Sequence, residues 1–416
     1  MQRSRVQRVA SIAAAVLCLS ALAACSESGD GGAQERRRPH VATPPGEPIK
    51  LSVLYPATGS QAAPSLLAGA EAAEAAINDA GGVKPAGGGE ARPIELVPCD
   101  ADNTKNPSQP AECARKVIDD GVVLDVAKYT LAGDEVDVFA KAGIPMLGTS
   151  PFSQQDLTND LVFPIGGAAA TLIPGTAAAL QASGAKKIAY LSLDIPAAHA
   201  APDFMKPVLQ DQSDLIDSVL LPVDQSADIA PYLAKLAEKK PDGIILGVPG
   251  PMLAQVVTGL RQAGYEGKFV ATPYSLPADT IKALGTDGEG MLSVSDFASP
   301  VSTDSAAMKR YNDEMDLYSN GADRDEYSLA AWASVHLAAE IAATLPKIDA
   351  PSFAKALPGY RADIGIAPPF TLGTKNIFLP FPRVFRATVQ YQEIKDGKVV
   401  ATGDGAFVDL NQLVTK

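Results

Sequence analysis

Hydroxyl groups and a lysine follow two of the short apolar segments of this chain. Thr149, Ser150 and Ser153 come after the apolar residues 145–147, at a predicted helix start. Hydroxyls beside free backbone N–H groups suit a carboxylate, although the same residue types also form ordinary helix caps and turns. Lys128 follows another apolar run, where its ammonium either pairs with an acid group in a partly desolvated cleft or stays solvated. These residues are the first candidates for contact with a ligand.

Tyr129 adds an aromatic candidate, whereas the residue patterns of common enzymes are missing. The Tyr129 ring either stacks on a ligand ring or packs inside the fold. Three histidines occur, but the sequence has neither a Gly-x-Ser-x-Gly elbow nor a His-Glu-x-x-His motif. The glycine-rich residues 285–290 lack the lysine and hydroxyl of a phosphate loop, so we interpret them as a turn. We therefore expect no catalytic residues, no metal and no cofactor.

Cysteine chemistry is predicted at three positions. Arg3, Arg5 and Arg8 precede an apolar core, which ends in a Leu-Ala-Ala-Cys sequence at Cys25. This pattern is typical of a lipoprotein signal peptide at residues 1–24, with Cys25 as the site of lipid attachment; an ordinary secretion signal is the alternative. In an oxidising compartment Cys99 and Cys113 can form a disulfide, and two free buried thiols are the alternative. The loop that they close would stabilise the fold by roughly 3 kcal/mol.

Composition argues against a nucleic-acid partner. The formal net charge is −13, and removal of the three arginines in residues 1–24 leaves −16. A chain this acidic is a poor partner for nucleic acid or for anionic lipid. Residues 25–48 are rich in Gly, Pro and charge, which predicts a flexible tether. We interpret acidic runs such as residues 323–326 as solvated loop faces.

Alternating strands and helices are predicted along the rest of the chain. The apolar runs predict strands at residues 49–54, 94–98, 122–126, 145–147, 187–192, 215–222, 243–247 and 269–272. Amphipathic patterns between and after them predict helices at residues 64–79, 111–120, 133–142, 200–211, 228–238, 251–263, 303–318 and 328–344. A hairpin is predicted from residue 384 to 394, followed by an Asp-Gly turn. This order indicates parallel sheets with helices on both faces.

Several of these segments, taken in order, resemble one family. Residues 69–83 (GAEAAEAAINDAGGV) and 94–100 resemble the first helix and second strand of type I periplasmic solute-binding proteins. The Gly-Ile-Pro at residues 143–145, the segment Gly184 to Ala189 and the segment Gly264 to Phe269 follow in the family's order. The similarity covers nearly all of residues 49–400. It is strongest to the branch that serves importers of branched-chain amino acids and amides.

The resemblance implies an α/β fold with two Rossmann-like lobes, a three-strand hinge and a ligand cleft between the lobes. Lobe 1 would comprise residues 49–166 plus 298–376, and lobe 2 residues 167–297 plus 377–416. Ligands of open α/β sheets lie beyond the carboxyl ends of the strands. The loops at these strand ends therefore contain the predicted ligand-binding residues: Tyr55, Thr58, Lys128, Tyr129, Thr149, Ser150, Phe152, Asp194 and Tyr274.

The chain departs from the pattern of amino-acid binders in this branch. Those proteins carry an acid after the strand that corresponds to residues 269–272, where it holds the ligand ammonium, but this chain has Pro273 and Tyr274. Asp194 or Asp296 could substitute. Without a substitute, a bound ammonium would lack its charge partner. We therefore expect a ligand with a carboxylate or other polar head and an apolar or aromatic body.

Two classes of function follow from these expectations. The first is an extracytoplasmic lipoprotein that captures a small solute and delivers it to the permease of an ABC importer; a standard binder of branched-chain amino acids or amides is its variant. The second is a cell-envelope hydrolase on a similar scaffold. The missing catalytic pattern favours the non-enzymatic class. We also expect a monomer that is held at the membrane through its lipid alone.

Overall fold

The computed structural model describes residues 43–59, 62–104, 106–148, 150–209, 212–224, 227–375 and 381–414. The predicted signal peptide and Cys25 lie outside these residues. Two separate sheets contain most of the strands, which confirms the predicted α/β fold class. We call the layers built on the first sheet lobe 1 and those built on the second sheet lobe 2; the residue limits predicted for the lobes stay a prediction.

The sheet of lobe 1 is wholly parallel, in the order β2-β1-β3-β4-β5. Its strands are β1 (Ile49–Tyr55), β2 (Ile94–Asp100), β3 (Leu124–Val126), β4 (Met146–Leu147) and β5 (Val162–Phe163). The lobe's helices are α1 (Pro64–Asp79), α2 (Gln109–Asp119), α3 (Asp134–Ala142), α4 (Gln154–Thr158), α10 (Ala306–Tyr318), α11 (Glu326–Thr344) and α12 (Ala350–Ala356). A two-stranded ribbon, β11 (Arg361–Ala362) with β12 (Phe370–Thr371), completes it.

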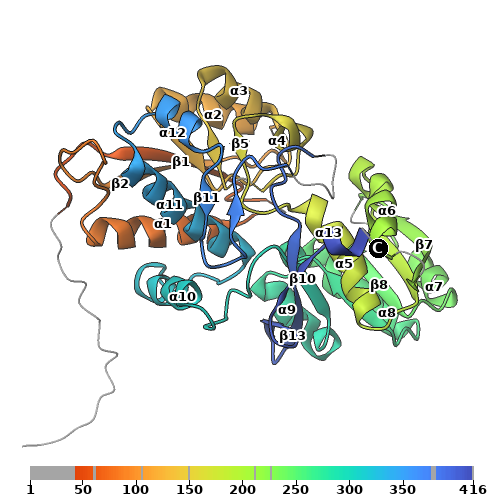
Figure 1. The fold of residues 1–416 in the computed structure, drawn as a ribbon. Coiled ribbons are helices and arrows are strands. Elements are labelled where there is room, and N and C mark those ends of the chain that lie inside the picture. The colour runs from red at the N-terminus through yellow and green to blue at the C-terminus, as the bar shows by residue number, and fades with distance from the viewer. Residues whose placement is uncertain are drawn as a thin grey trace, which may run out of the picture. The chain divides into compact units, whose positions relative to one another are not determined.

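Alternation along β1 explains why helices cover both faces of this sheet. Leu51 and Val53 point to one face, where they pack in a core with residues of α1 and α11. Leu54 points to the other face and packs with residues of α2 and α3. Because neighbouring side chains of a strand point to opposite faces, a strand with buried residues on both faces requires cover on both. Figure 1 shows α1 and α11 on one side of β1 and α2 and α3 on the other.

The sheet of lobe 2 is parallel from β7 to β10 and ends in antiparallel strands, in the order β14-β13-β10-β9-β8-β6-β7. Its strands are β6 (Lys187–Leu193), β7 (Asp214–Leu221), β8 (Gly243–Gly247), β9 (Lys268–Ala271), β10 (Leu292–Ser295), β13 (Thr388–Lys395), β14 (Lys398–Ala401) and β15 (Phe407–Asp409), the last paired with β13. Helices α5 (Ala169–Ala182), α6 (Pro196–Leu209), α7 (Ala230–Glu238), α8 (Gly250–Gln262), α9 (Ala278–Leu284) and α13 (Asn411–Val414) and the 3₁₀ turns η2 (Pro273–Ser275) and η3 (Gly285–Gly288) surround it. The hairpin predicted from residue 384 begins at residue 388 instead.

Helix α5 was not predicted, and its sequence explains why. Its residues are apolar all round, ten of the fourteen are buried, and Pro174 lies inside it. A helix with apolar residues on every side has no periodic pattern, and an internal proline normally argues against a helix. Packing against α6 and the lobe 2 sheet buries this segment as a helix.

Three chain segments cross between the lobes: residues 164–168, residues 296–305 and the segment that precedes β13. Arg386 lies in the third and is nearly fully buried. Its guanidinium donates hydrogen bonds to the carbonyl oxygen of Ile165 in the first crossover and to that of Asp296 in the second. It also donates to Thr388 at the start of β13. One buried cation therefore connects all three crossovers.

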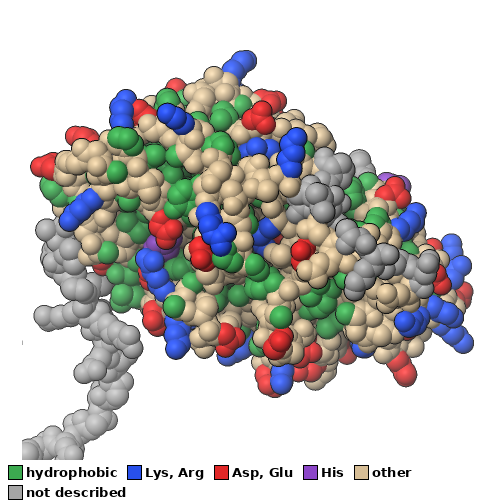
Figure 2. All heavy atoms as spheres, in the orientation of Figure 1, with side chains coloured by type: hydrophobic (Ala, Val, Ile, Leu, Met, Phe, Trp, Pro, Cys, Tyr) green, Lys and Arg blue, Asp and Glu red, His purple; other side chains and the backbone are tan. Residues whose placement is uncertain are grey.

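The face drawn in Figure 2 carries acidic and basic side chains that are interspersed, without a large patch of one sign. Among the described residues, no helix is long and apolar enough to cross a membrane.

Candidate functional site

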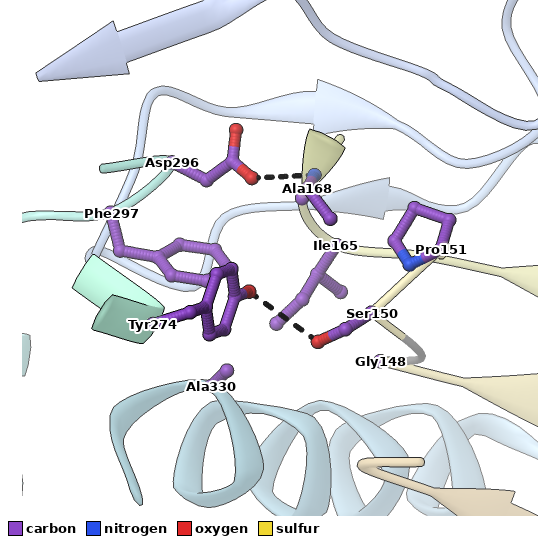
Figure 3. Close-up of a pocket in the computed structure, with 10 residues that line it drawn as sticks. Gly148, Ser150, Pro151, Ile165, Ala168, Tyr274, Asp296, Phe297 and Ala330 are labelled. Carbon is purple, nitrogen blue, oxygen red and sulfur yellow. Dashed lines mark hydrogen bonds between the residues drawn. The ribbon is translucent and has the colours of Figure 1, made fainter. Parts of the chain in front are cut away.

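A small pocket lies where the strand-end loops of the two lobes meet (Figure 3). About 10 Å³ of it admits the centre of a water molecule, which is room for about one water. The residues that line it are Gly148, Ser150, Pro151, Ile165, Gly166, Ala168, Tyr274, Asp296, Phe297 and Ala330. They come from the strand-end loop after β4, from two of the crossovers, from η2 and from α11. Such a small volume requires the lobes to separate before a solute enters.

Four aromatic rings gather at this junction. Tyr129, Phe152 and Tyr327 belong to lobe 1, and Tyr274 comes from η2 of lobe 2. The rings of Tyr129 and Tyr274 are almost parallel, 4° apart, with centroids 6.2 Å from each other. Phe152 meets both rings edge-on, at 5.5 Å and 5.4 Å, and Tyr327 lies at 4.8 Å and 5.0 Å from them. The structure thus brings three predicted site residues together and adds Tyr327, which was not predicted.

Hydroxyl groups accompany these rings. The Tyr274 hydroxyl points toward Ser150, with 3.5 Å between the two oxygens (Figure 3). Burial is the main reason why the pKa of Tyr274 and that of Tyr327 lie well above their ordinary value. Both phenols therefore keep their protons at neutral pH and can donate hydrogen bonds.

Asp296 lines the pocket, but both of its carboxylate oxygens already accept hydrogen bonds from the protein. Its Oδ2 accepts hydrogen bonds from the backbone N–H groups of Gly167 and Ala168, and its Oδ1 accepts one from Thr171. Because Gly167 and Ala168 belong to the first crossover, this carboxylate fastens the second crossover to the first. Asp296 is therefore an unsuitable substitute for the missing partner of a ligand ammonium.

Lys128 is placed differently from the sequence expectation. Its side chain is fully buried, and its Nζ lies 2.6 Å from Glu135 and 2.9 Å from Asp156. Nζ also donates a hydrogen bond to Thr130. Burial alone would raise the pKa of Glu135, but the charge and hydrogen bond of Lys128 outweigh it and lower this pKa to about 2. The ammonium is satisfied inside lobe 1, so neither predicted alternative, a ligand pair or a solvated lysine, describes it.

Tyr55, Thr58 and Asp194 are not among the residues that line the pocket. Tyr55 is buried at the end of β1, and Thr58 donates to Asp100 and Asp102 of the same lobe. Asp194 is exposed and lies 2.7 Å from His199, also an exposed residue. Thr149 lies outside the described residues. Their roles as ligand contacts remain predictions.

Two other predictions can be compared directly with the structure. Cys99 and Cys113 form a disulfide, as predicted. The acidic run at residues 323–326 is not simply a solvated face. Asp325 caps α11 through the backbone N–H of Ser328, and Glu326 is nearly fully buried. Ala330, one turn later in α11, lines the pocket. The position of Glu326 at the start of this helix was the available sign that it is buried, whereas its charge suggested exposure.

No group of three or more His, Cys, Asp or Glu side chains is arranged to hold a metal ion within the described ranges. The buried acids at the junction have other partners: Asp296 has backbone and hydroxyl donors, and Glu326 has the hydroxyl of Ser295. This arrangement can enclose and orient a small molecule.

A comparison with protein families identifies the class that this fold and pocket define. The "Periplasmic binding protein" family matches residues 48–379, and the chain therefore belongs to that family. The comparison with curated proteins finds no match.

Solved structures show the same fold. A solute-binding protein of an ABC transporter from R. palustris, in complex with 4-hydroxybenzoate, is 20% identical, with a TM-score of 0.69 over 87% of this chain and 98% of that one. Another R. palustris solute-binding protein, in complex with benzoate, is 17% identical, with a TM-score of 0.68 over 87% and 97%. The branched-chain amino acid binding protein of Streptococcus pneumoniae, in complex with isoleucine, is 17% identical, with a TM-score of 0.70 over 87% and 99%.

Proposed function

We propose that this protein is an extracytoplasmic lipoprotein that captures a small solute with a carboxylate and an apolar or aromatic body. It then delivers the solute to the permease of an ABC importer. One observation carries the choice of solute: the parallel rings of Tyr129 and Tyr274, which come from opposite lobes. Two similar structures contain benzoate and 4-hydroxybenzoate, which belong to this class of solute.

The parallel arrangement of the two rings suits a flat ligand body. A ring held between two others needs about 7 to 8 Å between the outer rings, twice the contact distance of carbon atoms. The centroids of Tyr129 and Tyr274 are 6.2 Å apart, so the lobes must open by at least about 1 Å. Phe152 and Tyr327 would then contact the edge of the ligand ring. Closure of the lobes on the solute would provide the differential affinity that such a receptor needs.

The polar head of the solute has candidate partners beside the rings. The hydroxyls of Ser150 and Tyr274 meet in the pocket and can both turn to a carboxylate. Thr149 remains a proposed partner from the same loop. Lys128 supports this loop through its backbone, because the N–H of Ser150 donates a hydrogen bond to the Lys128 carbonyl oxygen. Its proposed role is thus to position the loop rather than to bind the solute.

The other parts of the proposal rest on the sequence. Cys25 would carry the lipid that anchors the protein outside the cell membrane, and residues 25–48 would be the tether. The protein would act as a monomer that presents its closed lobes to the permease. A binder of branched-chain amino acids is the variant of this function, because one similar structure contains isoleucine.

Calorimetry on the full-length chain tests the proposal with benzoate, 4-hydroxybenzoate, L-isoleucine and a short aliphatic amide. We expect the aromatic carboxylates to bind most tightly, and Tyr274→Ala to weaken them at least about tenfold because half of the ring sandwich is lost. Tyr232→Ala, which removes an exposed tyrosine of lobe 2, is the control and should bind as the wild type does. Preference for isoleucine, or equal binding by both variants, would overturn the solute class, and hydrolysis of any probe would overturn the receptor function.

A further inference from the structure

Glu326 is a buried carboxyl group beside the pocket that the proposed contacts do not use. It is the first residue of α11, one helical turn before Ala330, which lines the pocket. Only 2% of its surface is exposed. A carboxyl group is rarely buried to this extent unless its oxygens have partners.

Within the described ranges, a side-chain partner is found for one oxygen of Glu326. The hydroxyl of Ser295, at the end of β10, donates a hydrogen bond to Oε2. Oε1 is buried, and no group of the described residues forms a hydrogen bond of ordinary geometry with it, although the backbone N–H of Asp296 acts on this carboxyl and lowers its pKa. Ser295 is itself held in place, because its Oγ accepts the backbone N–H of Phe297. The carboxyl group is therefore fixed through Oε2, and Oε1 is left for another molecule.

The neighbouring charges do not provide a partner for Oε1. Asp296 in the second crossover is another acid, and its oxygens are already bonded. Arg386 in the third crossover donates its bonds to carbonyl and hydroxyl oxygens, and Tyr274 of η2 directs its hydroxyl to Ser150. Among the described residues, no cation forms an ion pair with Glu326.

The protonation state of Glu326 follows from this environment. Burial, followed by the charge of Asp296, raises the pKa of Glu326 to about 8, although the Ser295 hydrogen bond, the charge of Arg386 and the backbone N–H of Asp296 oppose the rise. Glu326 is therefore mainly neutral at pH 7. Since Ser295 donates to Oε2, the proton belongs on Oε1, which then becomes a donor that has no acceptor among the described residues. A buried acid kept neutral so that it can donate a hydrogen bond is a known device of binding sites.

We propose that Glu326 is a specificity-determining residue of the cleft, which donates a hydrogen bond from Oε1 to an oxygen of the bound solute, such as a carboxylate oxygen. This inference rests on the proposed function and names a further contact for its solute. A neutral donor gives a ligand ammonium no compensating charge. The pocket therefore selects solutes with an acceptor at this end.

Two substitutions and a pH series test the proposal, with benzoate and benzylamine as probes in calorimetry on the full-length chain. Glu326→Leu removes the donor at similar volume, and we expect benzoate to bind about tenfold to a hundredfold more weakly. Glu326→Gln retains an N–H donor and should restore most of this loss. Wild-type affinity for benzoate should fall as the pH rises above about 8, where Glu326 ionises, whereas the Gln variant should show no such dependence. Benzylamine should bind weakly to all three chains.

The outcomes separate this inference from the proposed function. If wild type binds benzoate and Tyr274→Ala binds it at least about tenfold more weakly, the proposed function stands, and the Glu326 variants then test this inference alone. Equal binding by all three chains, or equal loss in the Gln and Leu variants, would then overturn it. Tight binding of benzylamine that the Gln variant loses would make Glu326 a charged partner of an ammonium instead. Failure of wild type to bind any carboxylate would overturn both claims. Thermal unfolding of each variant identifies a loss that comes from misfolding.

Discussion

The Lys128 side chain shows how burial changes the role of a charged residue. Its position after a strand predicted a contact with the ligand. Instead, Lys128 is paired with Glu135 and Asp156 inside lobe 1. A buried ion pair adds little net stability, but removal of one partner leaves an uncompensated charge in the protein interior. Removal of Lys128 is therefore expected to lower the free energy of unfolding by more than the ion pairs add to it.

Substitution of this lysine should consequently unfold lobe 1 more easily. We expect Lys128→Met to lower the free energy of unfolding by about 3–5 kcal/mol, since Glu135 and Asp156 lose their counter-charge. The control is Lys50→Met, which removes an exposed lysine 3.9 Å from Glu95 and should cost about 1 kcal/mol or less. Urea unfolding of both variants measures the difference. Equal losses would show that the buried cluster is not coupled as the distances indicate.

Asp125 should make stability depend on pH. This carboxyl is fully buried, and burial raises its pKa to about 8 despite the hydrogen bond from Ser52 and the charge of Lys128. In the folded chain it keeps its proton up to about pH 8, whereas in the unfolded chain it loses the proton near its ordinary pKa of 3.8. The unfolded state thus binds fewer protons between these values, and stability falls as the pH rises.

The measurement is urea unfolding at pH 5.5, 6.5 and 7.5. In this window we expect Asp125 to contribute a loss of up to about 1.4 kcal/mol per pH unit. Glu326 contributes in the same direction, because its pKa is also raised to about 8. Asp125→Asn, which cannot ionise, should show a shallower slope than wild type. Identical slopes would mean that Asp125 is ionised in the folded protein.

At the scale of elements, the close approach of α1 and α11 determines where the pocket helix lies. A Cβ atom added at Gly69 of α1 would lie 2.1 Å from the carbonyl oxygen of Ser328 and 2.6 Å from its Cα. Both contacts are with backbone, which cannot rotate away. A glycine at this position therefore permits the contact that places the first turns of α11 beside the cleft.

Gly69→Ala should push these two helices apart. We expect a loss of about 3 kcal/mol in the free energy of unfolding, the upper end of ordinary overpacking costs, and weaker binding of benzoate. Gly259→Ala in α8 is the matched control. Its Cβ would meet only the end of the flexible Leu233 side chain, so the gain in helix propensity should offset the contact. If the two variants unfolded alike in denaturant, the close packing of α1 on α11 would not limit stability.

At the scale of the whole molecule, the crossovers must bend as a unit when the lobes move. Arg386 and Asp296 connect these segments through buried hydrogen bonds to the backbone. These bonds restrain the crossovers relative to one another. The same two residues act in opposite directions on Glu326: the charge of Asp296 raises the pKa of this carboxyl and that of Arg386 lowers it.

Arg386→Met should release this restraint. We expect faster hydrogen exchange at the backbone N–H groups of Gly167 and Ala168, because Asp296 loses its neighbouring cation and holds them less firmly. Affinity for benzoate should fall as well. Arg361→Met, which removes an exposed arginine of β11, should leave both unchanged. Unaltered exchange in the Arg386 variant would show that the crossovers are held by packing alone.

Local pattern was enough to predict most of the fold. Helix α1 begins and ends at the predicted residues, and β8 does as well, since apolar periodicity and flanking glycines are properties of neighbouring residues. The Cys99–Cys113 pair was predicted because only two cysteines remained. Tyr129, Phe152, Ser150 and Tyr274 were selected as strand-end residues, and the structure brings all four together.

Tertiary structure alone decided which charges are buried and what they contact. Ser295 meets Glu326, Asp296 meets Gly167 and Arg386 meets Ile165, each between segments that the sequence does not mark as neighbours. A charged residue looks the same in a sequence whether water or a carboxyl group surrounds it. The solvation of a charged residue depends on chain segments that folding brings close to it. The helices and strands of this protein therefore follow from local sequence, whereas the hydrogen bonds of its buried polar groups are determined only when these elements assemble.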